Sequence, residues 1–147
     1  MSVNYGKGAK KKAVKLHSLL VRTRADFKCE SCGIARGMLR VNPNTKKETK
    51  VAIQCAHIIS RRYNATLTDE RNAVSLCASC HYGFGMDPLG FAQFIIGKHG
   101  TVDVYHDLRK KVDDKYAPDW DVEIERLQGL LDVAESENSD WLSDPVT

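Results

Sequence analysis

The sequence predicts a small α+β fold, with a β-hairpin and a short helix at its centre and α-helices on either side. A chain of 147 residues has room for one hydrophobic core, because domains commonly contain about 100 to 150 residues. Two C-x-x-C pairs lie far apart, at Cys29 and Cys32 and at Cys77 and Cys80. Between and around these pairs, β-like runs alternate with segments of helical spacing.

The cysteine spacing identifies candidate metal ligands. Paired C-x-x-C motifs are typical of zinc knuckles rather than of a disulfide framework, and four thiolates complete the tetrahedral shell of a structural Zn²⁺. The 44 residues between Cys32 and Cys77 exceed the roughly 15 to 20 of a compact zinc module. A zinc ribbon that only holds a small fold together would also explain these cysteines. Cys55 stands alone, and we expect a small buried side chain in a strand rather than a ligand.

The N-terminal region, residues 1–25, is basic. We expect a flexible arm over residues 1–12 and a helix over residues 13–25, where apolar residues recur among Lys and Arg without Pro or Gly. The arm carries three candidate contacts to phosphate groups, Lys10, Lys11 and Lys12. A solvated charged face explains lysines in this region equally well.

Residues 26–100 are predicted to form the central domain. Gly33 can adopt the positive φ that lets a knuckle wrap around an ion. The β-like runs at 38–41 and 51–58 are separated by Asn-Pro-Asn-Thr, which predicts a hairpin between them. Residues 60–70 show no sustained period and are expected to form a loop.

The second half of this domain is predicted to be helical. His81 should lie near the start of a short helical turn, which we expect Gly83 and Gly85 to interrupt. Asp87 and Pro88 then predict a helix, as N-cap and first helical residue, that ends near residues 97–100. The side chains expected to face inward from this helix are Leu89, Phe91, Phe94 and Ile95.

Residues 101–147 are predicted to form a helical C-terminal extension with an acidic tail. A helix is expected around residues 105–112. From Trp120 to Ala134, apolar residues recur every three or four positions, which predicts an amphipathic helix that packs on the domain or on a partner. Beyond Glu135 the composition is polar and acidic, so we expect a frayed end.

The net charge of +3 hides an asymmetry. Residues 1–112 contain 20 Lys and Arg against 8 Asp and Glu, a charge of +12, whereas residues 113–147 contain 2 against 11, a charge of −9. A basic body predicts an anionic partner such as nucleic acid. No apolar run approaches the roughly 20 residues that span a bilayer, and the start lacks the apolar core of a secretory signal. We therefore expect a cytoplasmic protein with no membrane partner.

Three polar residues indicate hydrolytic chemistry, two of them between the cysteine pairs and one directly after the second pair. A neutral imidazole can take the proton of a water molecule, while one divalent ion bridges a scissile phosphate. On a rigid strand, His57 suits the role of base, and Asn72 could hold that imidazole or its loop by hydrogen bonds. Next to Cys80, His81 suits a ligand of the ion.

Other polar residues have less specific interpretations. Arg61 and Arg62 follow His57 closely and are placed to meet phosphate oxygens, although a solvated loop pair is the alternative. The three remaining histidines have no such neighbours in the sequence, and we expect them to be structural or surface residues: His17, His99 and His106.

The motifs from Cys29 to His81 resemble a known family. The series C-x-x-C, A-H-I-I-S-R-R and R-N-A-V-S-L-C-A-S-C-H is similar to the HNH, or ββα-metal, endonucleases that contain a four-cysteine zinc site. The later run D-P-L-G-F-A-Q-F-I-I-G-K-H-G is similar to phage HNH nucleases of the lambdoid Rap recombination type. The resemblance implies a DNA endonuclease with a ββα-metal core, acting on branched or recombination DNA in the cytoplasm of a phage host.

The resemblance also implies a role for each residue. His57 corresponds to the general base, Asn72 to the structural asparagine of the loop, and His81 to a ligand of a catalytic Mg²⁺ or Mn²⁺, while the four cysteines hold structural Zn²⁺. One position departs from the pattern, because many of these enzymes carry an acidic residue or histidine before the base, where this chain has Ala56. Water and phosphate would then complete the shell of the ion.

Two other classes of function fit the sequence. One is a zinc-containing DNA-binding module without catalysis, which needs the cysteines and the basic arm but not His57. The other is an adaptor for phage DNA packaging or replication, which would use the Trp120 to Ala134 helix on a phage protein partner. A homodimer is also compatible with double-strand cutting.

Overall fold

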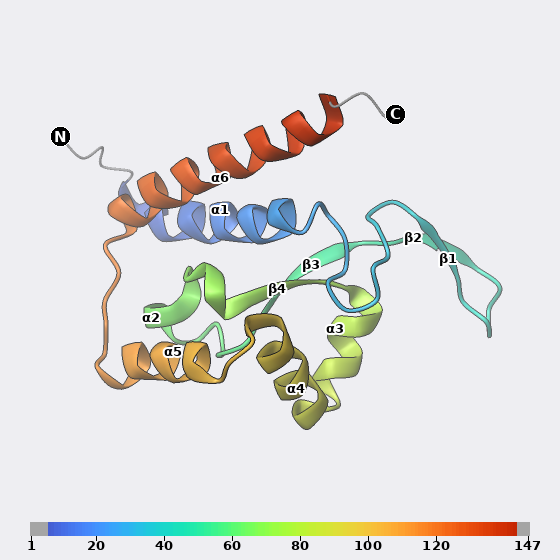
Figure 1. The fold of residues 1–147 in the computed structure, drawn as a ribbon, viewed down its shortest axis with the longest axis horizontal. Coiled ribbons are helices and arrows are strands. Elements are labelled where there is room, and N and C mark those ends of the chain that lie inside the picture. Colours follow the sequence, from blue (N-terminus) through green and yellow to red (C-terminus); the bar gives the residue numbers. More distant parts are fainter. Residues whose placement is uncertain (1–5, 144–147) are drawn as a thin grey trace.

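The computed structural model describes the backbone of residues 6–143 and the side chains of residues 6–138. Its elements stack in layers (Figure 1), with α6 outermost, α1 beneath it, a two-stranded sheet next, and the helices α3, α4 and α5 on the far side. The bounds of the layered elements are α1 Ala9–Arg24, β3 Ile53–His57, β4 Ala73–Cys77, α3 Ala78–Gly85, α4 Pro88–His99, α5 Asp103–Asp113 and α6 Trp120–Ser143. The shorter elements are η1 Gly6–Gly8, β1 Leu39–Val41, β2 Glu48–Lys50, α2 Asn64–Leu67 and η2 Glu70–Asn72.

The central sheet consists of β3 and β4, which run antiparallel from the pair Ile53 and Cys77 to the pair His57 and Ala73. All five residues of β4 are buried. One face of the sheet contributes Ala56, Val74 and Leu76 to a core that also contains Ile95 of α4. This apolar core fixes β4 beside β3 and sets the position of the helix that follows it.

The predicted hairpin between residues 38–41 and 51–58 is wrong. The first run pairs with β2, in the register Leu39 to Lys50 and Val41 to Glu48, and the second pairs with β4. The predicted turn itself is present, because Asn42 Oδ1 accepts hydrogen bonds from the amides of Asn44 and Thr45. The turn therefore connects β1 and β2 in a short hairpin. The run at 51–58 contains β3, which pairs with β4, a buried strand much later in the chain.

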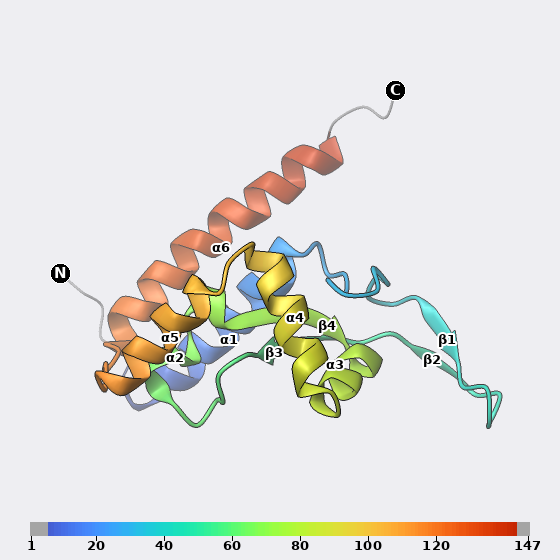
Figure 2. The ribbon, with the colours of Figure 1, turned by 60° about the horizontal axis from the view of Figure 1, so that its bottom comes forward.

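The β1–β2 hairpin projects away from the body of the protein (Figures 1 and 2). Its side chains are nearly all exposed, including the apolar Leu39 at 61% and Val41 at 52%. The sequence at its tip and second strand is basic, with Lys46, Lys47 and Lys50. The hairpin therefore adds little to the core and presents a basic and apolar surface.

Helices α1 and α6 lie side by side and run parallel. Near their starts, Lys10 Nζ lies 6.0 Å from the ring centroid of Trp120, and near their ends Asn138 Nδ2 donates to Thr23 O at 3.0 Å. The shared core contains the predicted apolar stripe of α6 together with one face of α1, in the cluster Ala9, Ala13, Leu20, Ile124, Leu127, Leu131 and Ala134. The amphipathic helix is thus confirmed, and its stripe is covered by α1.

Helix α1 begins before the predicted position. Lys10, Lys11 and Lys12 lie in its first turns, so the arm predicted over residues 1–12 is wrong for this part, and residues 1–5 lie outside the described residues. The C-terminal expectation is also wrong in part, because α6 continues to Ser143 and only the last four residues lie beyond the described chain. Packing against α6 accounts for the early start of α1, because Ala9 and Ala13 belong to the core that the two helices share.

The region after β3 contains more regular structure than predicted. The expected loop at 60–70 includes α2 and the start of η2, and α3 continues through Gly83 and Gly85 instead of stopping there. Helix α4 begins as predicted, with Asp87 accepting from Gly90 N, and ends at Gly100 with a φ of 73°. Leu89 was expected to face inward but is 80% exposed, because it lies in the first turn, away from the sheet.

Among the described residues, no helix is both long and apolar enough to cross a membrane.

The α1–α6 contact predicts a clear effect of truncating its centre. Leu127 is 0% exposed, so Leu127→Ala should lower the free energy of unfolding by about 2 to 5 kcal/mol through lost burial and a residual cavity. Denaturant unfolding followed by circular dichroism measures this change. Val133→Ala on the exposed side of α6 is the matched control and should change stability by less than about 0.5 kcal/mol. Equal effects of the two substitutions would contradict the packing described.

Candidate functional site

The four paired cysteines meet at one point, as predicted. Their Sγ atoms all lie within 4.8 Å of one another, and the Sγ atoms of Cys32 and Cys77 are 3.8 Å apart. Tetrahedral zinc with bonds of about 2.3 Å to sulfur requires sulfur separations of about 3.8 Å. The chain therefore forms a four-cysteine cluster that can hold a metal ion and fits a structural Zn²⁺.

Each cysteine pair forms a knuckle with backbone hydrogen bonds to sulfur. Cys29 Sγ accepts from Cys32 N, and Cys77 Sγ accepts from Cys80 N, each at 3.4 Å. Gly33 has a φ of 81° and its amide donates to Cys29 O at 2.8 Å, which confirms the predicted backbone of the first knuckle. The second knuckle coincides with the start of α3, where Cys77 is the N-cap.

The electrostatics of the cluster favour a bound cation. Burial alone would raise the pKa of Cys77, but the amide of Cys80 and the guanidinium of Arg40 outweigh burial and lower this pKa to about 6. Burial and the neighbouring sulfur atoms raise the pKa of Cys80 to about 12. Four thiolates whose sulfur atoms lie within 4.8 Å of one another repel, and a divalent metal ion would supply the compensating charge.

The side chain of His81 extends from α3 to β3. Its Nδ1 lies 2.7 Å from Oε1 of Gln54, and the imidazole is exposed. Because an amide oxygen only accepts, this contact places the ring proton on Nδ1 and leaves the lone pair of Nε2 for another partner. A second ring nitrogen fixed in this way is typical of histidines that bind metal ions.

His57 ends β3 and is held by the chain that follows it. Its Nε2 lies 3.0 Å from Leu67 O, and since a carbonyl only accepts, Nε2 carries the proton and Nδ1 the lone pair. Burial lowers the pKa of His57 most, the contact with Leu67 opposes this, and the charges of Arg61 and His81 lower it further. The imidazole is therefore neutral near pH 7, although Nδ1 is buried and has no hydrogen-bond partner.

Asn72 holds the segment between the two strands. Its Nδ2 donates to Ile59 O at 3.2 Å and to Thr66 O at 3.0 Å, and its Oδ1 accepts from Ile59 N at 2.7 Å. The side chain is 0% exposed. Asn72 was expected to hold either the imidazole of His57 or its loop. In this structure its amide hydrogen-bonds the loop and not the imidazole.

Ala56 faces away from His57. It is 1% exposed and belongs to the core with Val74 and Leu76, in line with the alternation of side chains along a strand. The position before the base histidine is therefore filled by a core residue. A charged metal ligand there would be buried in an apolar environment.

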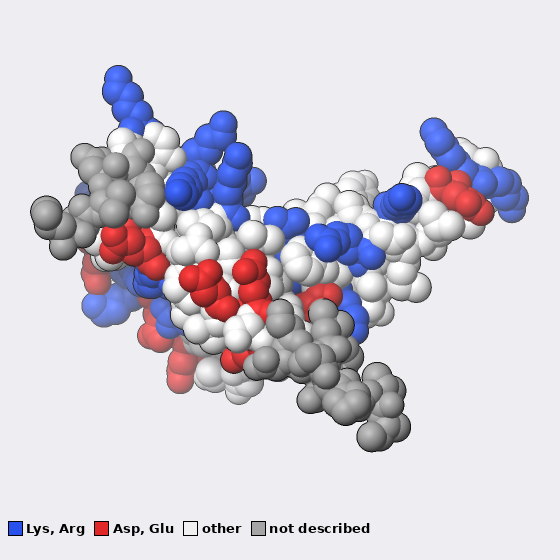
Figure 3. Space-filling view, turned by 90° about the horizontal axis from the view of Figure 1, so that it is seen from above, with Lys and Arg blue, Asp and Glu red and all other residues white. Residues whose placement is uncertain are grey.

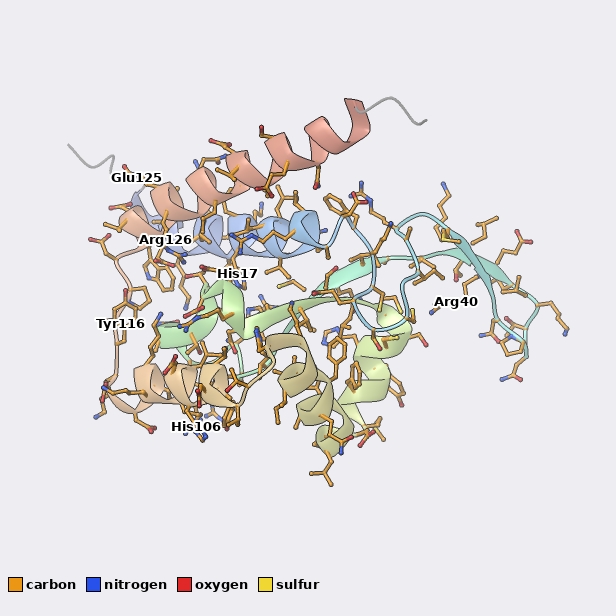
Figure 4. All side chains as sticks on the ribbon, in the orientation of Figure 1. His17, Arg40, His106, Tyr116, Glu125 and Arg126 are labelled. Atoms are coloured by element: carbon orange, nitrogen blue, oxygen red, sulfur yellow. The ribbon has the colours of Figure 1, made fainter. Side chains whose placement is uncertain are left out.

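His17 is the residue that sequence reasoning missed. It was expected to be a structural or surface residue, and it is 0% exposed. What the sequence did not indicate is its neighbour, because its ring centroid lies 5.3 Å from that of His57. It points from α1 toward the chain below the helix (Figure 4), where its Nε2 lies 3.0 Å from Asp69 O. The sequence contains one indication of this burial: His17 lies one helical turn from both Ala13 and Val21, which are buried on the same stripe of α1.

The environment of His17 and Cys55 keeps both side chains neutral. Burial, followed by the nearby His57, lowers the pKa of His17 to about 4. Burial also raises the pKa of the Cys55 thiol to about 11. Cys55 lies in β3, as expected, but it is half-buried rather than buried. Its sulfur lies within 4.8 Å of ligand atoms of His17 and His57.

The predicted substrate-binding residues lie at two places. Arg61 is exposed and close enough to His57 and Cys55 to influence the pKa of each, whereas Arg62 lies over the ring of Tyr63 at 5.7 Å. The three lysines of the predicted arm are exposed on the first turns of α1. His99 and His106 take no part in the cluster of His17, Cys55 and His57.

A charged network fixes the loop that supplies the carbonyl acceptors. The carboxylate of Asp69 accepts from Arg71 and from Lys111 of α5, each at 2.9 Å. From α6, Arg126 donates to Glu70 at 2.7 Å and to Thr68 O at 3.1 Å. Two flanking helices therefore hold residues 68–71 in place, and this segment contains the carbonyl that His17 contacts.

No family model, no curated protein and no solved structure matches the chain.

Removing one cysteine of the cluster tests its metal. Cys77→Ser should lower the zinc content by one ion per chain and weaken the fold strongly, because binding at such a site is coupled to folding. Elemental analysis of the purified protein and thermal unfolding measure these effects. Ser79→Ala, an exposed change between the ligands, is the control and should alter neither. Unchanged zinc content and an unchanged unfolding transition in the Cys77 variant would rule out the zinc assignment.

Proposed function

We propose that the protein is a metal-dependent DNA endonuclease of the HNH, or ββα-metal, kind. The supporting observation is the order of β3, β4 and α3, in which His57 ends the first strand, Asn72 precedes the second and His81 lies on the helix. The four-cysteine cluster joins the end of β4 to the first knuckle. The rings of His57 and His81 are each fixed by one hydrogen bond, with a lone pair left on the other nitrogen.

The catalytic ion would be held by His81 through Nε2. Mg²⁺ or Mn²⁺ bound there would neutralise charge on the scissile phosphate. Ala56 is a core residue and Nδ1 of His57 is buried, whereas the imidazole of His81 is exposed and its Nδ1 is held by Gln54. Water and phosphate oxygens would fill the remaining positions, which Mg²⁺ tolerates, so we expect weak metal binding without DNA.

The general base would be His57, acting through the lone pair on Nδ1. The contact with Leu67 O keeps the proton on the opposite nitrogen, and burial keeps the ring neutral. This nitrogen lies buried in the described structure. The proposal therefore requires the ring, or α1 above it, to move when DNA binds, so that Nδ1 reaches the attacking water.

A basic edge of the molecule supports DNA as the substrate. Figure 3 shows Lys and Arg side chains along one edge, as far as the projecting hairpin, while Asp and Glu side chains lie over α6. The exposed lysines of α1 and of the hairpin can meet phosphates without regard to sequence. Arg61 is close enough to the proposed base to lower its pKa, and it is the contact to the scissile phosphate that we propose.

The finer assignment rests on the resemblance over residues 87–100. We extend the proposal to branched or recombination DNA, in a phage context and the host cytoplasm, with a second copy of the chain or a phage protein as partner. The alternative of a non-catalytic zinc-containing DNA-binding module is favoured by one observation, the buried Nδ1 of His57. The adaptor alternative is weakened because α1 covers the apolar stripe of α6.

A nicking assay on supercoiled plasmid with Mg²⁺ or Mn²⁺ tests the proposed reaction. Loss of a general base costs about 100-fold or more in rate, so His57→Ala should fall at least that far, and His81→Ala should lose activity through loss of the ion. The control is His106→Ala, an exposed histidine on α5 (Figure 4), which should cut like the wild type. Metal-dependent cutting that survives His57→Ala would exclude His57 as the general base. A wild-type protein that does not cut would favour the alternative of a zinc-containing DNA-binding module without catalysis.

The pH dependence of cutting tests the state of the base. A base acts when neutral, and the pKa of His57 lies below its ordinary value of 6.5, mainly because of burial. The value of kcat/KM, which reports the base in the free enzyme, should therefore rise with pH on the acid side, reach half its maximum below pH 6.5 and be level above that pH. The charged or titratable neighbours are His17, Arg61 and His81. A midpoint above pH 6.5, measured while zinc content stays constant, would contradict the assignment.

A further inference from the structure

A second group of metal-ligating side chains lies between α1 and β3. His17 of α1 and Cys55 and His57 of β3 each offer one ligand atom, and these atoms all lie within 4.8 Å of one another. The two imidazole centroids are 5.3 Å apart, with an angle of 38° between the rings. The group shares no residue with the four-cysteine cluster.

Backbone carbonyl groups determine which ring nitrogens are available. Leu67 O contacts His57 Nε2 and Asp69 O contacts His17 Nε2, each at 3.0 Å. Since these oxygens only accept, both neutral rings carry the proton on Nε2 and the lone pair on Nδ1. Both Nδ1 atoms are buried and have no hydrogen-bond partner. Histidines that bind metal ions have this arrangement, with one nitrogen donating to a carbonyl and the other on the ion.

The donor atoms determine the class of ion. Two imidazole nitrogens and one thiolate suit Zn²⁺ or Co²⁺ and are poor ligands for Mg²⁺. Tetrahedral zinc would bring nitrogen and sulfur to separations of about 3.3 to 3.6 Å, and the ligand atoms lie within 4.8 Å of one another without an ion. We propose that His17, Cys55 and His57 form a second metal site, for Zn²⁺ or a similar thiophilic divalent ion.

The surroundings of Cys55 bear on the strength of this site. Arg22 and Arg61 act on the thiol and favour its thiolate, and the hydroxyl of Ser18 hydrogen-bonds it. When the ion binds, the thiol gives its proton to solvent and the sulfur forms the bond to the metal. The same arginines repel a dication, so we expect weaker binding here than at the four thiolates.

Occupation of the site has a consequence for the nuclease, and this part rests on the proposed function. A metal ion on Nδ1 of His57 takes the lone pair that would accept the proton of the attacking water. The same ion ties β3 to α1 and opposes the movement that would expose this nitrogen. Zn²⁺ at this site is therefore an inhibitor, whereas Zn²⁺ at the four cysteines is structural.

Metal counting on the full chain tests the site without DNA. The protein is equilibrated with Zn²⁺, desalted, and analysed for zinc per chain. We expect two ions in the wild type and one in both Cys55→Ser and His17→Gln, with two retained in the control His106→Gln. Circular dichroism verifies that each variant is folded. Cys55→Ser decides the question if the buried His17 variant does not fold, because Cys55 is half-buried and the change is small.

A spectroscopic measurement on the wild type gives an independent answer. Protein holding one zinc ion is titrated with Co²⁺, and a thiolate-to-cobalt absorption band should appear and be absent in Cys55→Ser. One ion in the wild type and no cobalt band would overturn the site, and two ions in every variant would overturn its ligands. A protein that binds two ions, and does not cut DNA even when only the four-cysteine cluster is filled, would count against the proposed nuclease alone. A protein that still holds one ion after equilibration with excess Zn²⁺, and cuts DNA, would count against the second site alone.

Discussion

The buried amide of Asn72 is the interaction on which the rest of the candidate site depends. Its three hydrogen bonds connect the backbone just after β3 to the end of α2, so the chain between the two strands has one conformation. A buried polar group left without a partner costs about 1 to 3 kcal/mol, and here both ends of the amide and three backbone groups are satisfied together. The carbonyl groups that orient His57 and His17 lie in the segment that this amide closes.

Two long-range forces then hold this segment against the helices. The carboxylate of Asp69 is nearly buried, and its pKa is lowered because Arg71 and Lys111 outweigh the cost of burial. Arg126 connects Glu70 and Thr68 to α6. Such buried ion pairs add less to stability than their short distances suggest, because desolvation offsets the attraction. Their effect is to fix one arrangement of α5, α6 and the loop, and with it the place of α1 over β3.

Much of the fold could be predicted from the sequence where the signals are local. The cysteine pairs, the N-cap at Asp87, the Gly100 helix end and the apolar stripe of α6 each follow from residues close together in the chain. Strand pairing could not be predicted, because the turn at residues 42–45 is compatible with either β2 or β3 as the partner of β1. The role of His17 also could not be predicted, since its neighbours Cys55 and His57 come together with it only when α1 crosses the sheet. Catalysis and DNA binding stay predictions.

The position of the proton on His57 connects the proposed activity to the concentration of zinc. One lone pair, on Nδ1 of His57, is needed by the proposed reaction and is also a donor of the proposed second metal site. The two uses exclude one another, whereas the four-cysteine cluster needs zinc in either case. Such a protein would fold at a low zinc concentration, which fills the four-cysteine cluster, and would be inhibited at a high zinc concentration, which fills the second site. The concentration of one ion would then set both the amount of folded protein and the fraction of it that can cut DNA.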